Sequence, residues 1–166
     1  MGAAAPQRFF EVLGECDGLQ DWFGELGGLD VRFRGDDATG RFSELPLDEA
    51  GFRSLAERLK APNAYLQAAL DRLQYGQAII AWQECSPGDL IDALVAIKAF
   101  HDTARVNALV KFFAAQGVDG QWEALQKLVA QLKRVRPAAD ETLRGAAFGA
   151  ALRDARIALV EAQRRR

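Results

Sequence analysis

Residues 86–97 read SPGDLIDALVAI, and this stretch indicates the kind of fold that the chain adopts. Ser86 is a residue type that caps helices, Pro87 suits a first helical turn, and Asp89 places an acid near the positive end of the helix dipole. The apolar residues that follow form one broad helical face, made of Leu90, Ile91, Leu94, Val95 and Ile97. We therefore expect a helix that begins at this proline and packs through one side.

Start signals followed by helical periodicity recur along the rest of the chain. Upstream, Pro6 and Asp48 begin helical patterns, and Pro62 opens a long candidate helix in which Gly76 is a possible interruption. Downstream starts are expected at Asp102 or Thr103, at Asp119, and at about Asp140 or Gly145. About seven helices with short connections predict an all-α, bundle-like domain.

Residues 29–42 (LDVRFRGDDATGRF) are the exception to this helical pattern. Val31 and Phe33 alternate with polar residues, which predicts either an ordered loop or one short extended segment near residues 30–34. A turn-rich stretch follows from Gly35 to Gly40. A single strand makes no sheet, so the all-α expectation stands.

The length of 166 residues fits one domain with its own core. We expect a single helical domain over residues 1–166, with a body at about 6–118 and a basic tail at about 119–166. No apolar run approaches the ~20 residues that span a bilayer, and residues 1–6 do not resemble a signal peptide. We therefore expect a cytoplasmic protein with no membrane partner. Cys16 and Cys85 lack metal-type spacing and are expected to be free thiols.

The net charge of −2 is distributed unevenly. Residues 121–166 contain ten basic and five acidic residues, a net charge of +5, which leaves −7 for residues 1–120. A basic segment on an acidic body fits an arm that binds a polyanion. Solvated helix faces with a frayed, arginine-rich end fit the same composition. Charge alone leaves both interpretations open.

Three short motifs are candidates for chemistry, and each has a plainer structural interpretation. Asp36-Asp37 has oxygen ligands for a divalent cation but no partner acids at regular spacing, which favours a solvated turn. The dyad formed by the only histidine, His101, and Asp102 lies at a helix junction and favours a cap. Gly145 and Gly149, in G-x-x-x-G spacing, indicate close helix packing or close approach of a ligand to the backbone. No set of nucleophile, base and orienting residue is present, so we expect a binding or structural unit, not a self-sufficient catalyst.

Four stretches, taken together and in order, resemble the C-terminal part of bacterial tRNA nucleotidyltransferases, the CCA-adding enzymes of the class shared with bacterial poly(A) polymerases. Residues 6–16, PQRFFEVLGEC, resemble the family's P-x-R-F-F-E-V-L-R-E-C signature, with Gly14 at a position that is often arginine. Residues 55–63, LAERLKAPN, resemble its L-x-x-R-L-x-x-P-N junction. Residues 89–117 are similar to its helical body, and residues 145–152 followed by Arg156 resemble its closing tail.

The sequence also departs from this family. We find no match to the catalytic head, with its Gly-Ser turn and Asp-x-Asp metal pair, so the head is expected to be absent from this chain. Some members carry an HD phosphohydrolase domain, and residues 41–51 resemble a degenerate remnant of it. Leu47 stands where the metal-binding histidine is expected, and only Asp48 is retained. The resemblance therefore implies neither a catalytic residue nor a metal ligand in this chain.

The resemblance implies that the chain is the tRNA-binding portion of an enzyme that adds CCA to tRNA 3′ ends from CTP and ATP. Mg²⁺ and both nucleotides are implied for the head alone, so this chain is expected to hold no cofactor. Its implied partner is the acceptor arm and elbow of tRNA, and no DNA partner is expected. The residues expected to contact RNA phosphates are Lys133, Arg134, Arg136, Arg153 and Arg156. The alternative is a stand-alone, degenerate HD-like helical module that binds other proteins.

Overall fold

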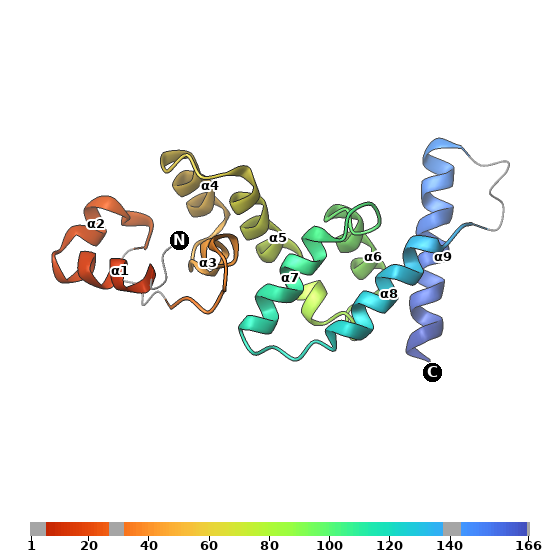
Figure 1. Ribbon diagram of the computed structural model, residues 1–166. Coiled ribbons are helices and arrows are strands. Elements are labelled where there is room, and N and C mark those ends of the chain that lie inside the picture. The colour runs from red at the N-terminus through yellow and green to blue at the C-terminus, as the bar shows by residue number, and fades with distance from the viewer. Residues whose placement is uncertain (1–5, 27–31, 138–143, 166) are drawn as a thin grey trace. The chain divides into compact units, whose positions relative to one another are not determined.

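The computed structural model describes residues 6–26, 32–137 and 144–165 of the chain, and these residues are all-α (Figure 1). They contain nine α-helices and one short 3-10 helix, η1 (Gly24–Leu26), and no strand. The α-helices are α1 (Pro6–Glu15), α2 (Gly18–Trp22), α3 (Ala38–Glu44), α4 (Glu49–Arg58), α5 (Asn63–Ile80), α6 (Pro87–Ala96), α7 (Ala104–Ala115), α8 (Trp122–Arg134) and α9 (Gly145–Arg164). The predicted fold class is confirmed. No helix in the described ranges is both long and apolar enough to cross a bilayer.

Capping accounts for several of the predicted helix starts. The side chain of Ser86 accepts a hydrogen bond from the backbone N–H of Asp89, and Pro87 is the first residue of α6. Asp48 accepts from the N–H of Gly51 at 2.8 Å and caps α4 in the same way. These bonds satisfy amide groups that have no partner within the helix. Both caps had been predicted, and both are confirmed.

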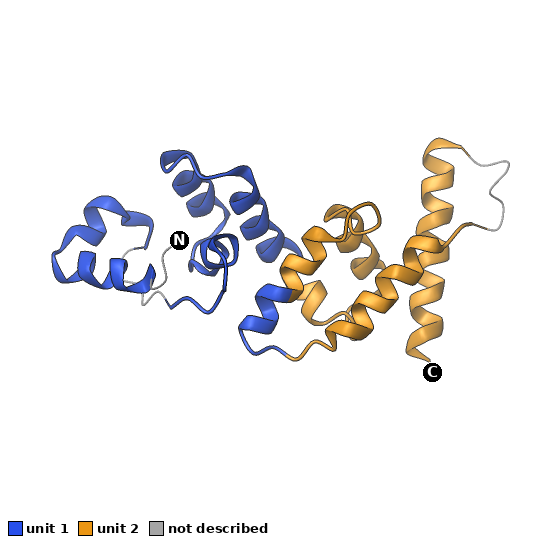
Figure 2. Ribbon diagram, in the orientation of Figure 1, with its two compact units in different colours: residues 1–76, 111–118 blue, residues 77–110, 119–166 orange. Residues whose placement is uncertain are grey.

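Unit 1, drawn in blue in Figure 2, comprises Met1–Gly76 and Lys111–Val118. Its core is a cluster of buried side chains contributed by η1, α3, α4, α5 and the segment between α3 and α4. The cluster consists of Leu26, Phe42, Leu45, Leu47, Phe52, Leu55, Ala56 and Ala69. Phe10 of α1 packs against this core from the side, so α1 is tied to the core through an aromatic side chain.

Helix α3 corrects the expectation for residues 38–40, which were predicted as the end of a turn-rich stretch over residues 35–40, whereas residues 35–37 precede the helix and are not helical. Asp37 caps the helix by accepting from the N–H of Gly40 at 2.7 Å. The Glu44 carboxylate accepts from the backbone N–H groups of Arg34 and Gly35, which fixes the chain just before the helix. Phe42 is buried in the core. Of the proposed extended segment, residues 32–34 are not in a strand, and residues 30–31 lie outside the described residues.

Gly76 does not interrupt α5, which continues through it to Ile80. A Cβ atom at this position would lie 2.8 Å from the ring of Phe113, a residue of the same unit. Such a distance is shorter than real Cβ contacts allow. The glycine is therefore required by side-chain packing, not by a break in the helix.

Unit 2, drawn in orange in Figure 2, comprises Gln77–Val110 and Asp119–Arg166. Its buried side chains come from α6, α8 and α9, from parts of α5 and α7, and from the segments between α5 and α6 and between α6 and α7. They include Ile79, Leu90, Ile91, Leu94, Ile97, Leu125, Leu128, Leu132 and Val160. Within this unit α9 packs against both α6 and α8 (Figure 1).

Two tryptophans of unit 2 hold the chain that leads into α8. The indole N–H of Trp82 donates to the carbonyl oxygen of Gly120 at 2.7 Å. The ring of Trp122 lies against Gly120 so closely that a Cβ atom there would be 2.1 Å from it. Gln83 and Gln121 exchange hydrogen bonds through their side-chain amides. The loop is thereby fixed at the point where α8 begins.

Helices α4, α6 and α7 end in the same Schellman geometry, in which the second residue after the helix has a positive φ. That residue is Gly117 after α7, but it is a lysine after the other two helices, Lys60 with φ 51° and Lys98 with φ 57°. In α6, Lys98 N–H donates to Val95 O and Ala99 N–H donates to Leu94 O. The lysines occupy a backbone conformation that favours glycine.

Candidate nucleic-acid interface

The last turn of α8 presents exposed cations on the side opposite the core. The buried apolar face of this helix consists of Leu125, Leu128 and Leu132, whereas Lys133 and Arg134 are exposed. Cations in the last turn lie near the negative end of the helix dipole, which favours them there. No acidic side chain in the described ranges forms an ion pair with either one. Both positive charges therefore face solvent.

Arg136 folds back onto the end of the same helix. Its Nη1 donates to the carbonyl oxygen of Val135 at 3.0 Å and to that of Lys133 at a longer 3.4 Å. The side chain is exposed, and the Pro137 that follows is buried and anchors the chain. Arg136 thus places its guanidinium beside the exposed turn that contains Lys133 and Arg134.

Arg156 reaches this turn from α9. Its guanidinium carbon lies 3.7 Å from the centroid of the Phe100 ring, in a cation–π arrangement. Its Nε donates to the carbonyl oxygen of Leu132 at 3.3 Å. Burial and, after it, the nearby charge of Arg136 lower the pKa of the Arg156 guanidinium. Arg136, which follows α8, and Arg156, which belongs to α9, therefore meet at one helix end.

Arg153, although it is one turn away from Arg156 on α9, makes a different contact. Its Nε and Nη2 donate to the two carboxylate oxygens of Asp92, each at 2.7 Å. This pair joins α9 to α6, and Nη2 also lies against the first turn of α6 at Gly88. Of the five predicted residues, the structure brings Lys133, Arg134, Arg136 and Arg156 to the end of α8. It directs Arg153 to α6.

Arg164 is a cation of the tail that sequence reasoning did not single out. Its Nη1 donates to Cys85 O at 2.7 Å, and its Nη2 donates to Trp82 O. Its Nε is buried without a hydrogen-bond partner. Arg156, Val160 and Arg164 are spaced four residues apart, and Val160 is fully buried. This spacing around an apolar residue is the signal that identifies the packed face of α9.

The other candidate motifs are occupied by structural roles. The Asp37 carboxylate caps α3 and accepts from Lys111 Nζ at 2.8 Å. Asp102 accepts from the N–H of Ala104, the first residue of α7, as expected for a cap. Leu47 lies in the core of unit 1 and, as described above, Asp48 caps α4. The described residues contain no group of three or more His, Cys, Asp or Glu side chains placed to hold a metal ion.

The G-x-x-x-G motif does not mediate close packing with any helix that the structure describes. Gly149 is exposed, and no atom of the described residues would lie within 4 Å of a Cβ added there. Gly145 has φ 57°, and a Cβ added there would likewise have no atom of the described residues within 4 Å. Within the described residues the packing interpretation is therefore not supported, because none of them lies close to either glycine.

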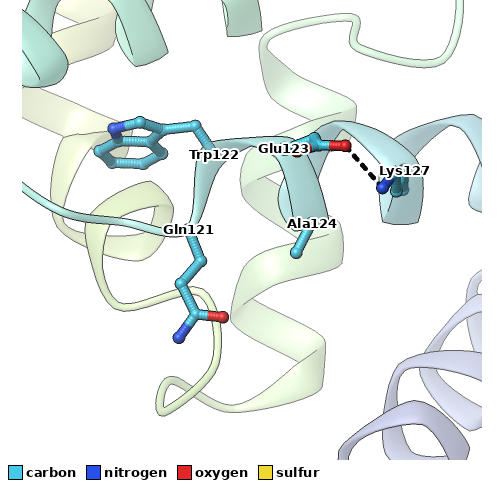
Figure 3. A pocket seen from close by; sticks show the side chains of 5 residues that line it. All are labelled: Gln121, Trp122, Glu123, Ala124 and Lys127. Carbon is cyan, nitrogen blue, oxygen red and sulfur yellow. Dashed lines mark ion pairs between the residues drawn. The ribbon is translucent and has the colours of Figure 1, made fainter.

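A shallow depression of about 350 Å³ lies at the start of α8 (Figure 3). Its lining residues are Gln121, Trp122, Glu123, Ala124 and Lys127. The Glu123 carboxylate and the Lys127 ammonium form an ion pair at 2.6 Å, drawn as a dashed line in Figure 3. The two charges neutralise each other, so this depression has no unpaired acid or base for catalysis.

Cys16 and Cys85 are both free thiols, as predicted. The basic turn of α8 is the strongest candidate for a functional surface in the described residues, and its exposed cations are suited to binding an anion. No family model, curated protein or solved structure matches this chain.

Proposed function

We propose that this chain is the tRNA-binding portion of a CCA-adding tRNA nucleotidyltransferase. The four sequence stretches between residues 6 and 156 support this proposal, because they occur in the family's order along the chain. In this proposal the transfer of nucleotides from CTP and ATP, with Mg²⁺, belongs to the family's catalytic head. The residues of the present chain contribute affinity for the acceptor arm and elbow.

The observation that carries the proposal is the group of exposed cations at the end of α8. Lys133, Arg134 and Arg136 are exposed and form no ion pair with an acid of the described ranges. Other exposed cations are neutralised nearby, such as Lys127 by Glu123 and Arg53 by Glu49. Double-stranded RNA is recognised mainly through its shape, phosphates and 2′-hydroxyls, for which exposed cations on a rigid helix end are suited.

The experiment is a salt titration of RNA binding. A fluorescently labelled minihelix of the tRNA acceptor and T arms is titrated with the protein at several salt concentrations, and anisotropy gives the Kd. Three phosphate contacts predict that the logarithm of the association constant falls by about 2–3 for each tenfold rise in salt. A single strand of the same composition is expected to bind more weakly, because it lacks the A-form shape.

The matched variants test whether this surface is responsible. The triple variant K133A/R134A/R136A is expected to lose most of its affinity and most of its salt dependence. The control is Lys127→Ala, which removes a cation from the same helix, where that cation is already paired with Glu123. Equal affinity and equal salt slope in the triple variant and the wild type would contradict the proposal.

A second candidate function, a protein-interaction module, is favoured by a specific observation on α1 and α2. The side chains of Phe9, Val12 and Trp22 are 53%, 41% and 68% exposed. A contiguous exposed apolar patch is typical of a protein-binding surface, and these side chains would contribute to one. This function predicts no RNA affinity that depends steeply on salt, so the titration described above discriminates between the two.

A further inference from the structure

Backbone carbonyl oxygens at the C-terminal end of α8 accept hydrogen bonds from two guanidinium groups, and Leu132 O also accepts from the N–H of Val135. Leu132 O accepts from Arg156, whereas Lys133 O and Val135 O accept from Arg136. The last carbonyl groups of a helix have no partner within the helix, and they attract cations. Both arginines are thereby held at the same helix end, although one follows α8 and the other belongs to α9.

Arg156 is fixed before any ligand arrives. Stacking on Phe100 restrains the plane of the guanidinium, and the bond from Nε to Leu132 O fixes its rotation. A guanidinium has five N–H donors, so four donors on Nη1 and Nη2 remain after this bond. In the part of the chain that the structure describes, no carboxylate forms an ion pair with Arg156 or with Arg136.

The two like charges repel each other, and an anion would relieve this repulsion. After burial, the charge of Arg136 contributes to the lowered pKa of Arg156, as expected for two like charges at one helix end. The exposed ammonium of Lys133 and the exposed guanidinium of Arg134 add positive charge to the same turn. An anion bound here would therefore be attracted by several cations and would not have to displace a carboxylate of the described residues.

The planar fork of a guanidinium fits the geometry of phosphate oxygens and can donate two bonds to one phosphate group. We propose that Arg136 and Arg156 together form a phosphate seat that binds one phosphodiester of an RNA backbone. This inference rests on the proposed function for the source of the phosphate. Lys133 and Arg134 then strengthen binding through charge, whereas Arg136 and Arg156 fix the position of one phosphate.

The first arm of the test uses inorganic phosphate alone. In ¹⁵N-labelled protein, the Nε–H signals of Arg136 and Arg156 are followed while phosphate is added at constant ionic strength, with chloride as the control anion. Both signals are expected to shift with one common affinity. Arg136→Ala is expected to abolish the shift of the Arg156 signal, and Lys127→Ala is expected to leave it unchanged.

The second arm measures the affinity for the tRNA minihelix. Arg136→Ala is expected to weaken binding by roughly tenfold and to lower the salt slope by about one phosphate contact. Arg136→Lys keeps the charge but loses the fork, so its affinity is expected to fall with the slope unchanged. Arg156→Lys is a further variant, and the Arg136 variants decide the result if this one fails to fold, because Arg136 is exposed.

The outcomes separate the two proposals. Shifts of both arginine signals together with weakened RNA binding by the Arg136 variants support the phosphate seat. A second outcome is that the wild type binds RNA, neither Arg136 variant changes its affinity, and phosphate causes no shifts. This outcome overturns the phosphate seat and leaves the proposed function standing. Phosphate-induced shifts without RNA binding by the wild type overturn the proposed function and support the seat for a phosphate from another source.

Discussion

Arg153 and Asp92 form a two-bond ion pair in which Nε meets Oδ1 and Nη2 meets Oδ2, each at 2.7 Å. The pair joins the middle of α9 to α6. The hydrogen bonds from Arg153 hold the pKa of Asp92 below its ordinary value of 3.8, and Asp92 in turn raises the pKa of Arg153. The pair therefore links the packing of α9 to pH.

The first prediction is that Asp92→Asn destabilises the protein at neutral pH but not in acid. Because the pKa of Asp92 is lowered on folding, the carboxylate stabilises the fold above its ordinary pKa of 3.8, and this contribution is lost as the pH falls through the lowered value. Urea unfolding followed by circular dichroism over a pH series measures the difference. The control is Glu161→Gln, which changes an exposed acid of α9. Equal stability of wild type and Asp92→Asn at every pH would refute the prediction.

A second prediction concerns RNA and the same pair. If Arg153 contacts a phosphate, it must first exchange Asp92 for that phosphate. Asp92→Asn removes the competing negative charge, so we expect this variant to bind the tRNA minihelix several-fold more tightly than the wild type. Anisotropy titrations at one salt concentration measure the change. Unchanged affinity in Asp92→Asn, together with unchanged affinity in Arg153→Ala, would limit Arg153 to its structural contact with α6.

The third prediction separates the two roles of Asp37. Asp37→Asn keeps an oxygen that can cap α3 but loses the charge that faces Lys111, whereas Asp37→Ala loses both. The loss of a cap costs about 1 kcal/mol, so Asp37→Ala is expected to be the less stable variant at all pH values. The hydrogen bond from Lys111 and then that from Gly40 lower the pKa of Asp37. The difference between wild type and Asp37→Asn should therefore be complete above the ordinary pKa of 3.8 and should be lost as the pH falls through the lowered value.

Asp48 provides the matched control for this experiment. It caps α4 through Gly51 as Asp37 caps α3 through Gly40, but it forms no ion pair with a cation of the described residues. Asp48→Asn is therefore expected to lose less stability at neutral pH than Asp37→Asn, because no ion pair is lost with the charge. A pH-dependent loss of stability in Asp48→Asn, equal to that in Asp37→Asn, would show that Lys111 is not the cause.

The fourth prediction is that glycine stabilises the ends of α4 and α6. Lys60 and Lys98 have positive φ values, which cost a side-chain-bearing residue about 1 kcal/mol relative to glycine. Lys98→Gly and Lys60→Gly are each expected to raise the free energy of unfolding by about this amount, measured by urea unfolding. Lys127→Gly, inside α8, is expected to lower it, because glycine weakens the interior of a helix.

The fifth prediction compares two glycines that lie inside helices. Gly149→Ala is expected to stabilise the protein by about 0.5–1 kcal/mol, because alanine favours the helix and the new Cβ meets no described atom. Gly76→Ala is expected to destabilise it by about 1–3 kcal/mol, because the Cβ would collide with Phe113. Thermal or urea unfolding measures whether each variant is more or less stable than the wild type. If Gly149→Ala also weakens RNA binding, then the backbone of α9 approaches the ligand closely at this residue.

The fold class and the helix starts at Asp48 and Ser86 could be predicted because each depends on residues within one or two turns of one another. Helix α3 could not, because residues before and within its first turn are typical of turns, namely Gly35, Asp36, Asp37 and Gly40. Its stability comes from more distant groups: the burial of Phe42 in the core and the Glu44 side chain that accepts from Arg34 and Gly35. The role of Gly76 was hidden for the same reason, since Phe113 is remote in sequence.

For the candidate interface, the sequence identifies the cations but not their contacts. Nothing local distinguishes Arg153 from Lys133, because the partner of Arg153 is Asp92, 61 residues away. The contacts of Arg156 with Phe100 and Leu132 likewise depend on how α9 packs in unit 2. Composition therefore predicts where positive charge is concentrated, and tertiary packing determines which charges stay exposed.

The placement of the three tryptophans gives each unit a different optical environment. Trp22, in unit 1, is largely exposed to water, whereas unit 2 contains the buried Trp82 and the partly buried Trp122, both in contact with Gly120. Replacing Trp22 with phenylalanine leaves indole fluorescence in unit 2 alone. Emission from that variant then follows the melting of unit 2, while the far-ultraviolet signal follows the helices of both units, so that one sample reveals whether the two halves of the chain unfold together or in sequence.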